Sequence, residues 1–131
     1  MKTIDVCVRR ANSHSYDCCA EEDVSNSLLI GYGKTAKEAI DDFYLSYEEL
    51  KAMDGDKVPD VEFNIKFDVG SLFNYYNFIN MEGIAKLSGI SPSVLRQYAS
   101  GARSPKEKTL QMLKDGIAKA TEQIKSVMLC A

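Results

Sequence analysis

Long apolar runs and tryptophan are missing from this sequence of 131 residues, which also contains only three prolines and one histidine. A helix that spans a bilayer needs about 20 consecutive, mostly apolar residues, so we predict neither a membrane span nor a membrane partner. Within residues 1–5 an acidic residue occurs before any apolar stretch that could form the core of a signal peptide. We therefore expect a cytoplasmic protein. The content of 45% hydrophobic and 27% charged residues predicts a globular protein that folds without a cofactor.

Metal-binding motifs are missing as well. The four cysteines are Cys7, Cys18, Cys19 and Cys130, and no two of them form a Cys-x-x-Cys pair. Because neighbouring residues of a strand point to opposite faces, we expect Cys18 and Cys19 to be reduced thiols, with at least one of them in the core. His14 lies in a polar stretch that predicts a turn, and no third group is in place to orient it as a base. We therefore predict no metal site and no Cys–His nucleophile.

Basic residues are scarce in the first part of the chain. Residues 1–78 contain 8 Lys and Arg against 15 Asp and Glu, a net charge of −7, whereas residues 79–131 contain 8 against 4, a net charge of +4. This asymmetry is typical of a protein in which one module meets phosphates and the other does not. It favours a boundary near residue 70, and we predict two domains, residues 1–68 and 69–131.

The first module has the pattern of an α+β fold. Ile4, Val6 and Val8 alternate with polar residues, as a half-buried strand requires. The order predicted from these patterns is strand, strand, strand, helix, strand, over residues 4–10, 16–20, 28–32, 35–53 and 61–67.

The predicted helix of the first module has clear start and stop signals. Thr35 and Glu38 form a capping box, and Gly55 supplies the stop. Its outer face is rich in carboxylates, which are either solvated or form a docking surface for a basic partner. These acidic residues are Glu38, Asp41, Asp42, Glu48 and Glu49.

Residues 84–98 have the spacing of two short helices that cross at a tight turn. Asn80 is placed to cap the first helix, and Gly89 tolerates the left-handed conformation that ends it. Ser91 is placed to cap the second helix, with Pro92 at its first position, where a missing N–H costs nothing. The pattern predicts a helix-turn-helix.

The outer face of the second helix carries side chains suited to DNA. Ser93, Arg96, Gln97 and Ser100 follow one another at helical spacing. Arg and Gln make bidentate contacts to guanine and adenine edges, while Ser91, Ser93 and the helix N-terminus suit phosphate or base contacts. The alternative is an ordinary helical hairpin whose outer side chains are merely solvated.

After this helix, Gly101 supplies a stop, and residues 104–107 read as a second capping box with Pro105 at the first helical position. With these features, residues 78–113 resemble the lambda-repressor/Cro-like family, including its Ser-Gly-x-Arg-x-Pro connection at residues 100–105. The resemblance implies that Ser93, Arg96 and Gln97 read bases and that Arg103 contacts phosphate. The sequence departs from the family at Ser88, where an apolar residue is usual, and at Ala99, where many members carry Glu.

The first module has its own resemblance. Residues 31–40 (Gly-Tyr-Gly-Lys-Thr-Ala-Lys-Glu-Ala-Ile) and the proline segment at 54–60 resemble HicB-like antitoxins, although the Gly-rich first turn and the Pro-containing second turn of that family are missing. The resemblance implies a βββαβ module similar to part of the ribonuclease H fold. It also implies a small ribonuclease toxin as partner, with a DNA-binding module following in the chain, as the helix-turn-helix does here.

The end of the chain predicts self-association. Apolar residues recur at spacings of three and four, the pattern of a helix seam. They are Leu110, Leu113, Ile117, Ala120, Ile124 and Val127. We expect the seam to close the helical core and, in its distal part, to pair protomers into a homodimer or higher homo-oligomer. Gly116 is a position where this helix could break, and the apolar spacing over residues 68–80 predicts the first helix of the same bundle.

Together these patterns predict a transcriptional regulator that binds double-stranded operator DNA, and the resemblance to HicB-like antitoxins implies that it is the antitoxin of a HicA/HicB-type pair that represses its own operon. Two other hypotheses remain open. One is a stand-alone repressor that senses a ligand or is controlled by assembly, without a toxin. The other is a residual nuclease using Asp5, Asp17 and Asp68, but metal catalysis needs carboxylates that converge, and we expect no enzyme.

Overall fold

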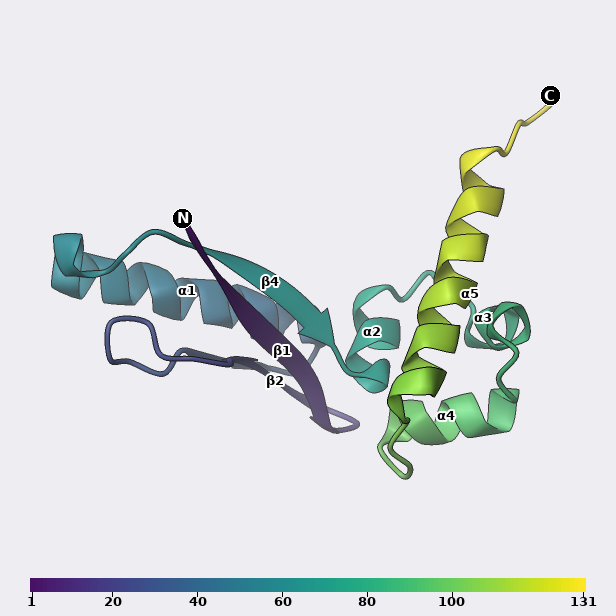
Figure 1. The fold of residues 1–131 in the computed structure, drawn as a ribbon, viewed down its shortest axis with the longest axis horizontal. Coiled ribbons are helices and arrows are strands. Elements are labelled where there is room, and N and C mark those ends of the chain that lie inside the picture. The colour runs from purple at the N-terminus through teal and green to yellow at the C-terminus, as the bar shows by residue number, and fades with distance from the viewer. The chain divides into compact units, whose positions relative to one another are not determined.

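The computed structural model describes the backbone of residues 1–131 and every side chain except that of residue 56. Within the described chain the fold is mixed α+β, with one four-stranded sheet and five α-helices. The chain divides into two compact units, residues 1–76 and residues 77–131 (Figure 1). Each unit is considered by itself below.

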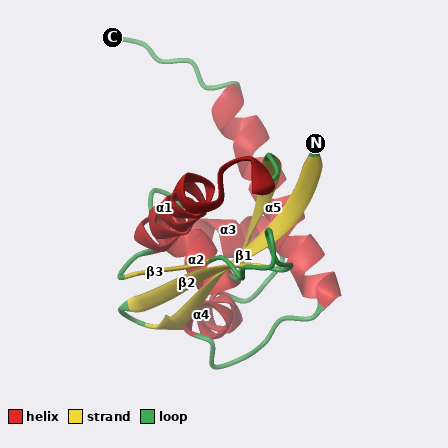
Figure 2. Ribbon diagram, turned by 90° about the vertical axis from the view of Figure 1, so that its left-hand side faces the viewer, coloured by secondary structure: helices red, strands yellow, loops and turns green.

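The strands of the first unit are β1 (Lys2–Asn12), β2 (Ser15–Ala20), β3 (Ile30–Gly33) and β4 (Val61–Phe67). Their order in the sheet is β3-β2-β1-β4. Figure 2 shows β3, β2 and β1 side by side. The pairs β1–β2 and β2–β3 are antiparallel, whereas β1 and β4 are parallel, so β4 forms one edge of the sheet. All four predicted strands are present, although β1 is longer than expected.

One long helix, α1 (Ala36–Asp54), covers a face of the sheet. The Thr35 hydroxyl accepts a hydrogen bond from the Glu38 N–H at 3.1 Å, which satisfies a free donor of the first turn. The Glu38 carboxylate in turn accepts the Lys34 N–H at 2.9 Å. Gly55, with a φ of 54°, ends the helix and opens the short 3₁₀ helix η1 (Gly55–Lys57). The predicted cap at Thr35 and the stop at Gly55 are confirmed, but the second half of the capping box is not formed, because Glu38 accepts the N–H of Lys34 and not that of Thr35.

Gly31 of β3 allows α1 to lie unusually close to the sheet. A Cβ at this position would overlap the Ala39 carbonyl oxygen and lie 2.7 Å from the Phe43 Cα. The contact involves main-chain atoms, which cannot turn aside as a flexible side chain can. A side chain at residue 31 would therefore push the helix away from the sheet.

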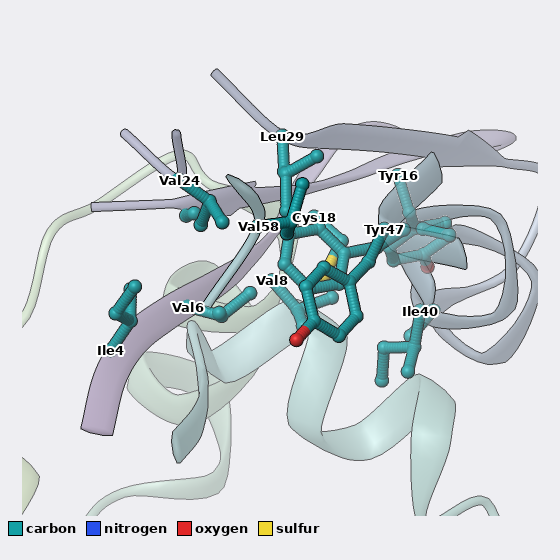
Figure 3. Packing of buried hydrophobic residues seen from close by; sticks show 14 residues of the cluster. Ile4, Val6, Val8, Tyr16, Cys18, Val24, Leu29, Ile40, Tyr47 and Val58 are labelled. Carbon is teal, nitrogen blue, oxygen red and sulfur yellow. The ribbon is translucent and has the colours of Figure 1, made fainter. Parts of the chain in front are cut away.

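The core of the first unit lies between α1 and the sheet (Figure 3). Ile4, Val6 and Val8 of β1 are buried, as their alternation predicts. Cys18 is buried with them, and Cys19, one residue later, is only half-buried on the other face. This confirms the expected arrangement of the two adjacent thiols.

The helix α2 (Val69–Tyr75) belongs to the first unit and not to the helical bundle, so the prediction for residues 68–80 is wrong in this respect. The Asp68 carboxylate accepts hydrogen bonds from the Ser71 N–H at 2.8 Å and from the Arg10 N–H of β1 at 3.0 Å. The Tyr75 ring packs against Phe67 of β4 with 5.2 Å between centroids. These contacts hold α2 against the sheet. The division between units falls after residue 76 rather than after residue 68.

The second unit contains α3 (Met81–Ser88), α4 (Pro92–Ser100) and α5 (Glu107–Lys125). Gly116 does not break α5, contrary to expectation, because the helix uses it for a close crossing with α3. A Cβ at Gly116 would overlap the Ser88 Oγ and lie 2.9 Å from the Ser88 Cα. The crossing also explains why Ser88 stands where an apolar residue is usual: a larger side chain would not fit against α5.

Candidate nucleic-acid interface

The turn between α3 and α4 is built as the sequence predicts. The Asn80 side chain accepts the Gly83 N–H at 3.1 Å and begins α3. Gly89 has a left-handed φ of 74° and ends it. Ile90 is buried beneath the turn, and Pro92 occupies the first turn of α4. The two helices are therefore joined by three residues, of which Gly89 supplies the left-handed turn, and Pro92 follows at the first position of α4.

Ser91 departs from its predicted role. It occupies the cap position of α4, but its side chain makes no capping hydrogen bond. Its carbonyl accepts the Leu95 N–H at 2.9 Å, so only the main chain starts the helix. Since Ser91 is exposed, its hydroxyl lies at the solvent-facing N-terminus of α4, where the helix dipole favours anions.

The outer face of α4 is the polar surface that the spacing predicts. Leu95 is fully buried. On the opposite side, Ser93, Arg96 and Gln97 are exposed. Ser100 is exposed too, but its hydroxyl donates to the Gln97 carbonyl at 3.1 Å and accepts the Ala102 N–H at 3.3 Å. Three predicted site residues thus share one accessible face, while Ser100 is engaged in the end of the helix.

Arg103 lies in the loop that follows α4, and its side chain is exposed. Its N–H donates to the Gln97 carbonyl at 3.3 Å, which ties the loop to the end of α4. The capping box predicted at residues 104–107 is wrong, because α5 begins only at Glu107, after Lys106, and no side chain caps it. The extended stretch before α5 leaves Arg103 on the outside of the turn.

Glu82 of α3 is a neighbour of the site that the sequence analysis missed. Its Oε1 lies 4.0 Å from the Arg96 Nη1, and both side chains are more than half exposed. An exposed ion pair at this distance contributes little stability, so the Arg96 side chain can separate from Glu82 at little cost in free energy. The approach of the two helices, rather than any linear motif, brings this carboxylate to the site.

The second unit, which contains α4, carries a net positive charge. The net charge of +4 found for residues 79–131 also holds for the whole second unit, because residues 77 and 78 are uncharged. A positive potential of this kind attracts the phosphates of a duplex. The exposed basic side chains of α3, α4 and the following loop are Lys86, Arg96, Arg103 and Lys106.

The three carboxylates considered for a nuclease have different surroundings. The Asp5 carboxylate binds the Lys66 Nζ at 2.7 Å, and this hydrogen bond is the main reason why the pKa of Asp5 is lowered. Asp68 caps α2, and Asp17 stands opposite Arg9 in the β1–β2 register. No cluster of three or more His, Cys, Asp or Glu suited to a metal occurs among the side chains that the structure describes.

The comparisons with known proteins add no relative. No family model, no curated protein and no solved structure matches this chain. No helix of the described chain is both long enough and apolar enough to cross a membrane.

Proposed function

We propose that the protein is a transcriptional regulator that binds double-stranded operator DNA through a helix-turn-helix formed by α3 and α4. The observation that carries the proposal is the exposed face of Ser93, Arg96 and Gln97 on a helix that starts at a proline after a left-handed glycine turn. In such a motif the second helix enters the major groove with its N-terminal residues toward the bases. Arg103 is then placed to contact phosphate.

We further propose that the first unit is a HicB-like antitoxin module. The succession β1, β2, β3, α1, β4 supports this assignment, as does the close contact of Gly31 with α1, which accounts for the glycine in the Gly-x-Gly segment. The net charge of the unit is −7, which suits a small basic ribonuclease toxin as partner. The protein then acts by binding, neutralising the toxin and repressing its own operon, and catalyses no reaction itself.

Self-association through α5 completes the proposal. Only Leu113 and Gly116 of α5 are buried, and the distal part of the helix extends beyond α3 and α4 (Figure 1). Ile124, in the last turn of α5, is 68% exposed, whereas Val127, which the predicted seam also includes, lies beyond the end of the helix at Lys125 and is 60% exposed. Pairing two copies along the distal part of α5 would bury Ile124 and present two recognition helices to a palindromic operator.

Alanine variants test the DNA-binding proposal, with fluorescence anisotropy on a fragment of the protein's own promoter and on a scrambled fragment. Arg96→Ala or Gln97→Ala should each cost about 1–3 kcal/mol on the promoter and reduce the preference for it. Arg103→Ala should weaken binding to both fragments similarly. Equal effects of all three variants on both fragments would contradict the assignment of roles.

Co-expression separates the antitoxin from a stand-alone repressor. In this test the gene is co-expressed with the open reading frame beside it. An antitoxin should restore growth that the neighbouring protein alone arrests, and should co-purify with it. DNA binding without any such rescue would favour the stand-alone repressor.

A further inference from the structure

The outer edge of β4 carries main-chain groups without partners in the sheet. The Asp68 N–H donates to the Val8 carbonyl of β1 at 3.0 Å, and in a parallel ladder alternate residues of a strand face the same neighbour. Residues 62, 64 and 66 therefore face β1, and the N–H and C=O groups of Phe63 and Ile65 point away from it. Along the described chain nothing pairs with these two residues on that side.

A groove of about 500 Å³ runs along this edge, between β4 and the second half of α1. Because α1 packs mainly on β3, β2 and β1, it leaves the core-facing side chains of β4 only partly covered. Phe63 forms the floor of an aromatic cluster, with ring centroids 5.0 Å from Tyr47 and 5.8 Å from Tyr44. Tyr44 is itself 40% exposed. Three aromatic side chains thus line the groove together with Val61 and several polar side chains.

The charged side chains that line the groove are acidic. Glu48 of α1 and Glu62 of β4 line it, and no lysine or arginine does. Among the described side chains neither glutamate forms an ion pair. The nearest lysine on α1, Lys51, lies over the Tyr47 ring and 3.8 Å from Asp60. The groove therefore offers two free negative charges beside apolar surface.

We propose that this groove accepts an extended segment of a basic protein, which pairs with β4 as a fifth strand of the sheet. The outward N–H and C=O groups of Phe63 and Ile65 supply the main-chain hydrogen bonds, the aromatic cluster receives apolar side chains, and Glu48 and Glu62 bind flanking lysines or arginines. The inference rests on the proposed function only in that this function gives the first unit a basic protein partner.

A second copy of the same chain suits the edge less well than a basic partner. Pairing β4 with its own copy would bring together two units that each carry a net charge of −7. An unprotected edge strand with alternating apolar residues is also a hazard for aggregation unless something covers it. A basic strand satisfies the hydrogen bonds and the charge together.

The probe for a test is the capped peptide Lys-Val-Lys-Phe-Lys-Val-Lys, titrated into the full-length protein and followed by calorimetry and by amide NMR shifts. The peptide should bind and should shift the amide signals of Phe63 and Ile65. The same peptide with glutamate in place of lysine should not bind. Binding of both peptides alike, or shifts confined to β3 at the other edge, would overturn the proposal.

Strand pairing itself is tested with N-methylated peptides. In one peptide the main-chain nitrogens of the three apolar residues are methylated, and in the other peptide those of the two inner lysines. Because successive N–H groups of a strand point to opposite edges, the two peptides are blocked at opposite edges. One of the two peptides should lose binding, and the other should keep it. Equal binding by both would show that main-chain hydrogen bonds to β4 are not used, and would overturn the proposal.

The charge contribution has a matched pair of variants on α1. Glu48→Lys should weaken binding of the basic peptide roughly tenfold, whereas Glu49→Lys, next to it but outside the groove, should change it less than about twofold. Ile65→Pro removes an outward N–H at an edge position that tolerates proline, and should abolish binding. A dimer of the unmodified protein that Ile65→Pro dissociates would assign the edge to a second copy and overturn the proposal.

The outcome is independent of the DNA-binding proposal, because promoter binding is measured on the same proteins. Peptide binding without promoter binding would refute the regulator and leave the groove assignment standing. Promoter binding without peptide binding would refute the groove assignment and leave the regulator standing.

Discussion

The crossing of α3 and α5 makes a quantitative prediction, because two glycines of the second unit lie in opposite surroundings. Gly116 of α5 is buried, and a Cβ there would overlap the Ser88 Oγ and lie 2.9 Å from the Ser88 Cα and Cβ. Gly83 of α3 is exposed, and the nearest atom to its Cβ would be that of Asn80 at 3.8 Å. The same substitution should therefore have opposite effects at the two positions.

The magnitudes follow from two competing contributions. Replacing glycine by alanine inside a helix stabilises it by about 1 kcal/mol. Overpacking a close contact costs about 1–3 kcal/mol, and the upper part of that range applies at Gly116 because main-chain atoms of α3 must move. Gly83→Ala should therefore stabilise the second unit by about 1 kcal/mol, and Gly116→Ala should destabilise it by about 1–2 kcal/mol.

Urea unfolding followed by far-UV circular dichroism measures these changes, at one fixed protein concentration because self-association shifts apparent stability. Hydrogen exchange of the amides in α3 and α5 assigns the change to the second unit. Ser88→Ala is a useful companion, because the buried Ser88 Oγ has no hydrogen-bond partner in the described structure and its removal should cost little. If Gly116→Ala stabilised the protein as much as Gly83→Ala does, the proposed close crossing would be refuted.

Three further predictions concern charge and thiol chemistry. Glu82→Gln should strengthen binding to promoter and scrambled DNA alike, because it removes a negative charge 4.0 Å from the arginine of α4; unchanged affinity in an anisotropy assay would contradict this. Alkylation followed by mass spectrometry at about pH 8 should modify exposed Cys130 first and Cys18 only on unfolding, since burial raises the pKa of Cys18 to about 12; early labelling of Cys18 would contradict its burial. The hydrogen bond from Lys66 lowers the pKa of Asp5 in the folded protein. The Asp5–Lys66 pair therefore stabilises the fold at a pH above the usual aspartate pKa, and this stabilisation is lost as the pH falls through the lowered pKa of Asp5. Asp5→Asn should therefore flatten the dependence of Tm on pH on the acidic side, and an unchanged slope would count against the pair.

Local signals in the sequence were sufficient for most of the strands and for the long helix of the first unit. Alternation of apolar residues located β1 and β4, and the cap at Thr35 and the stop at Gly55 fixed α1. The start of β3 was placed too early, at Leu28 rather than Ile30, because apolar residues before the strand are also buried: Leu29 lies in the core and its carbonyl accepts the Ala20 N–H at 3.1 Å, but the ladder with β2 begins only at Ile30.

Three further differences from the predictions depend on tertiary contacts. The apolar spacing in α2 shows that a helix forms but not which core receives it, and the contacts of Asp68 and Tyr75 attach it to the sheet. Gly116 resembles a helix breaker until the Ser88 crossing is known. In the candidate site, periodicity predicted the exposed face of α4, but the position of Glu82 beside Arg96 depends on how two helices pack.

The most direct test of the central claim is the affinity for the protein's own promoter, compared with a scrambled duplex of the same length over a series of salt concentrations. A regulator with a phosphate-binding helix-turn-helix should prefer the promoter by roughly 10³-fold or more and should lose affinity steeply as salt increases, because bound phosphates release counterions. Equal affinity for both duplexes, or no binding at low salt, would contradict the claim that α3 and α4 recognise operator DNA.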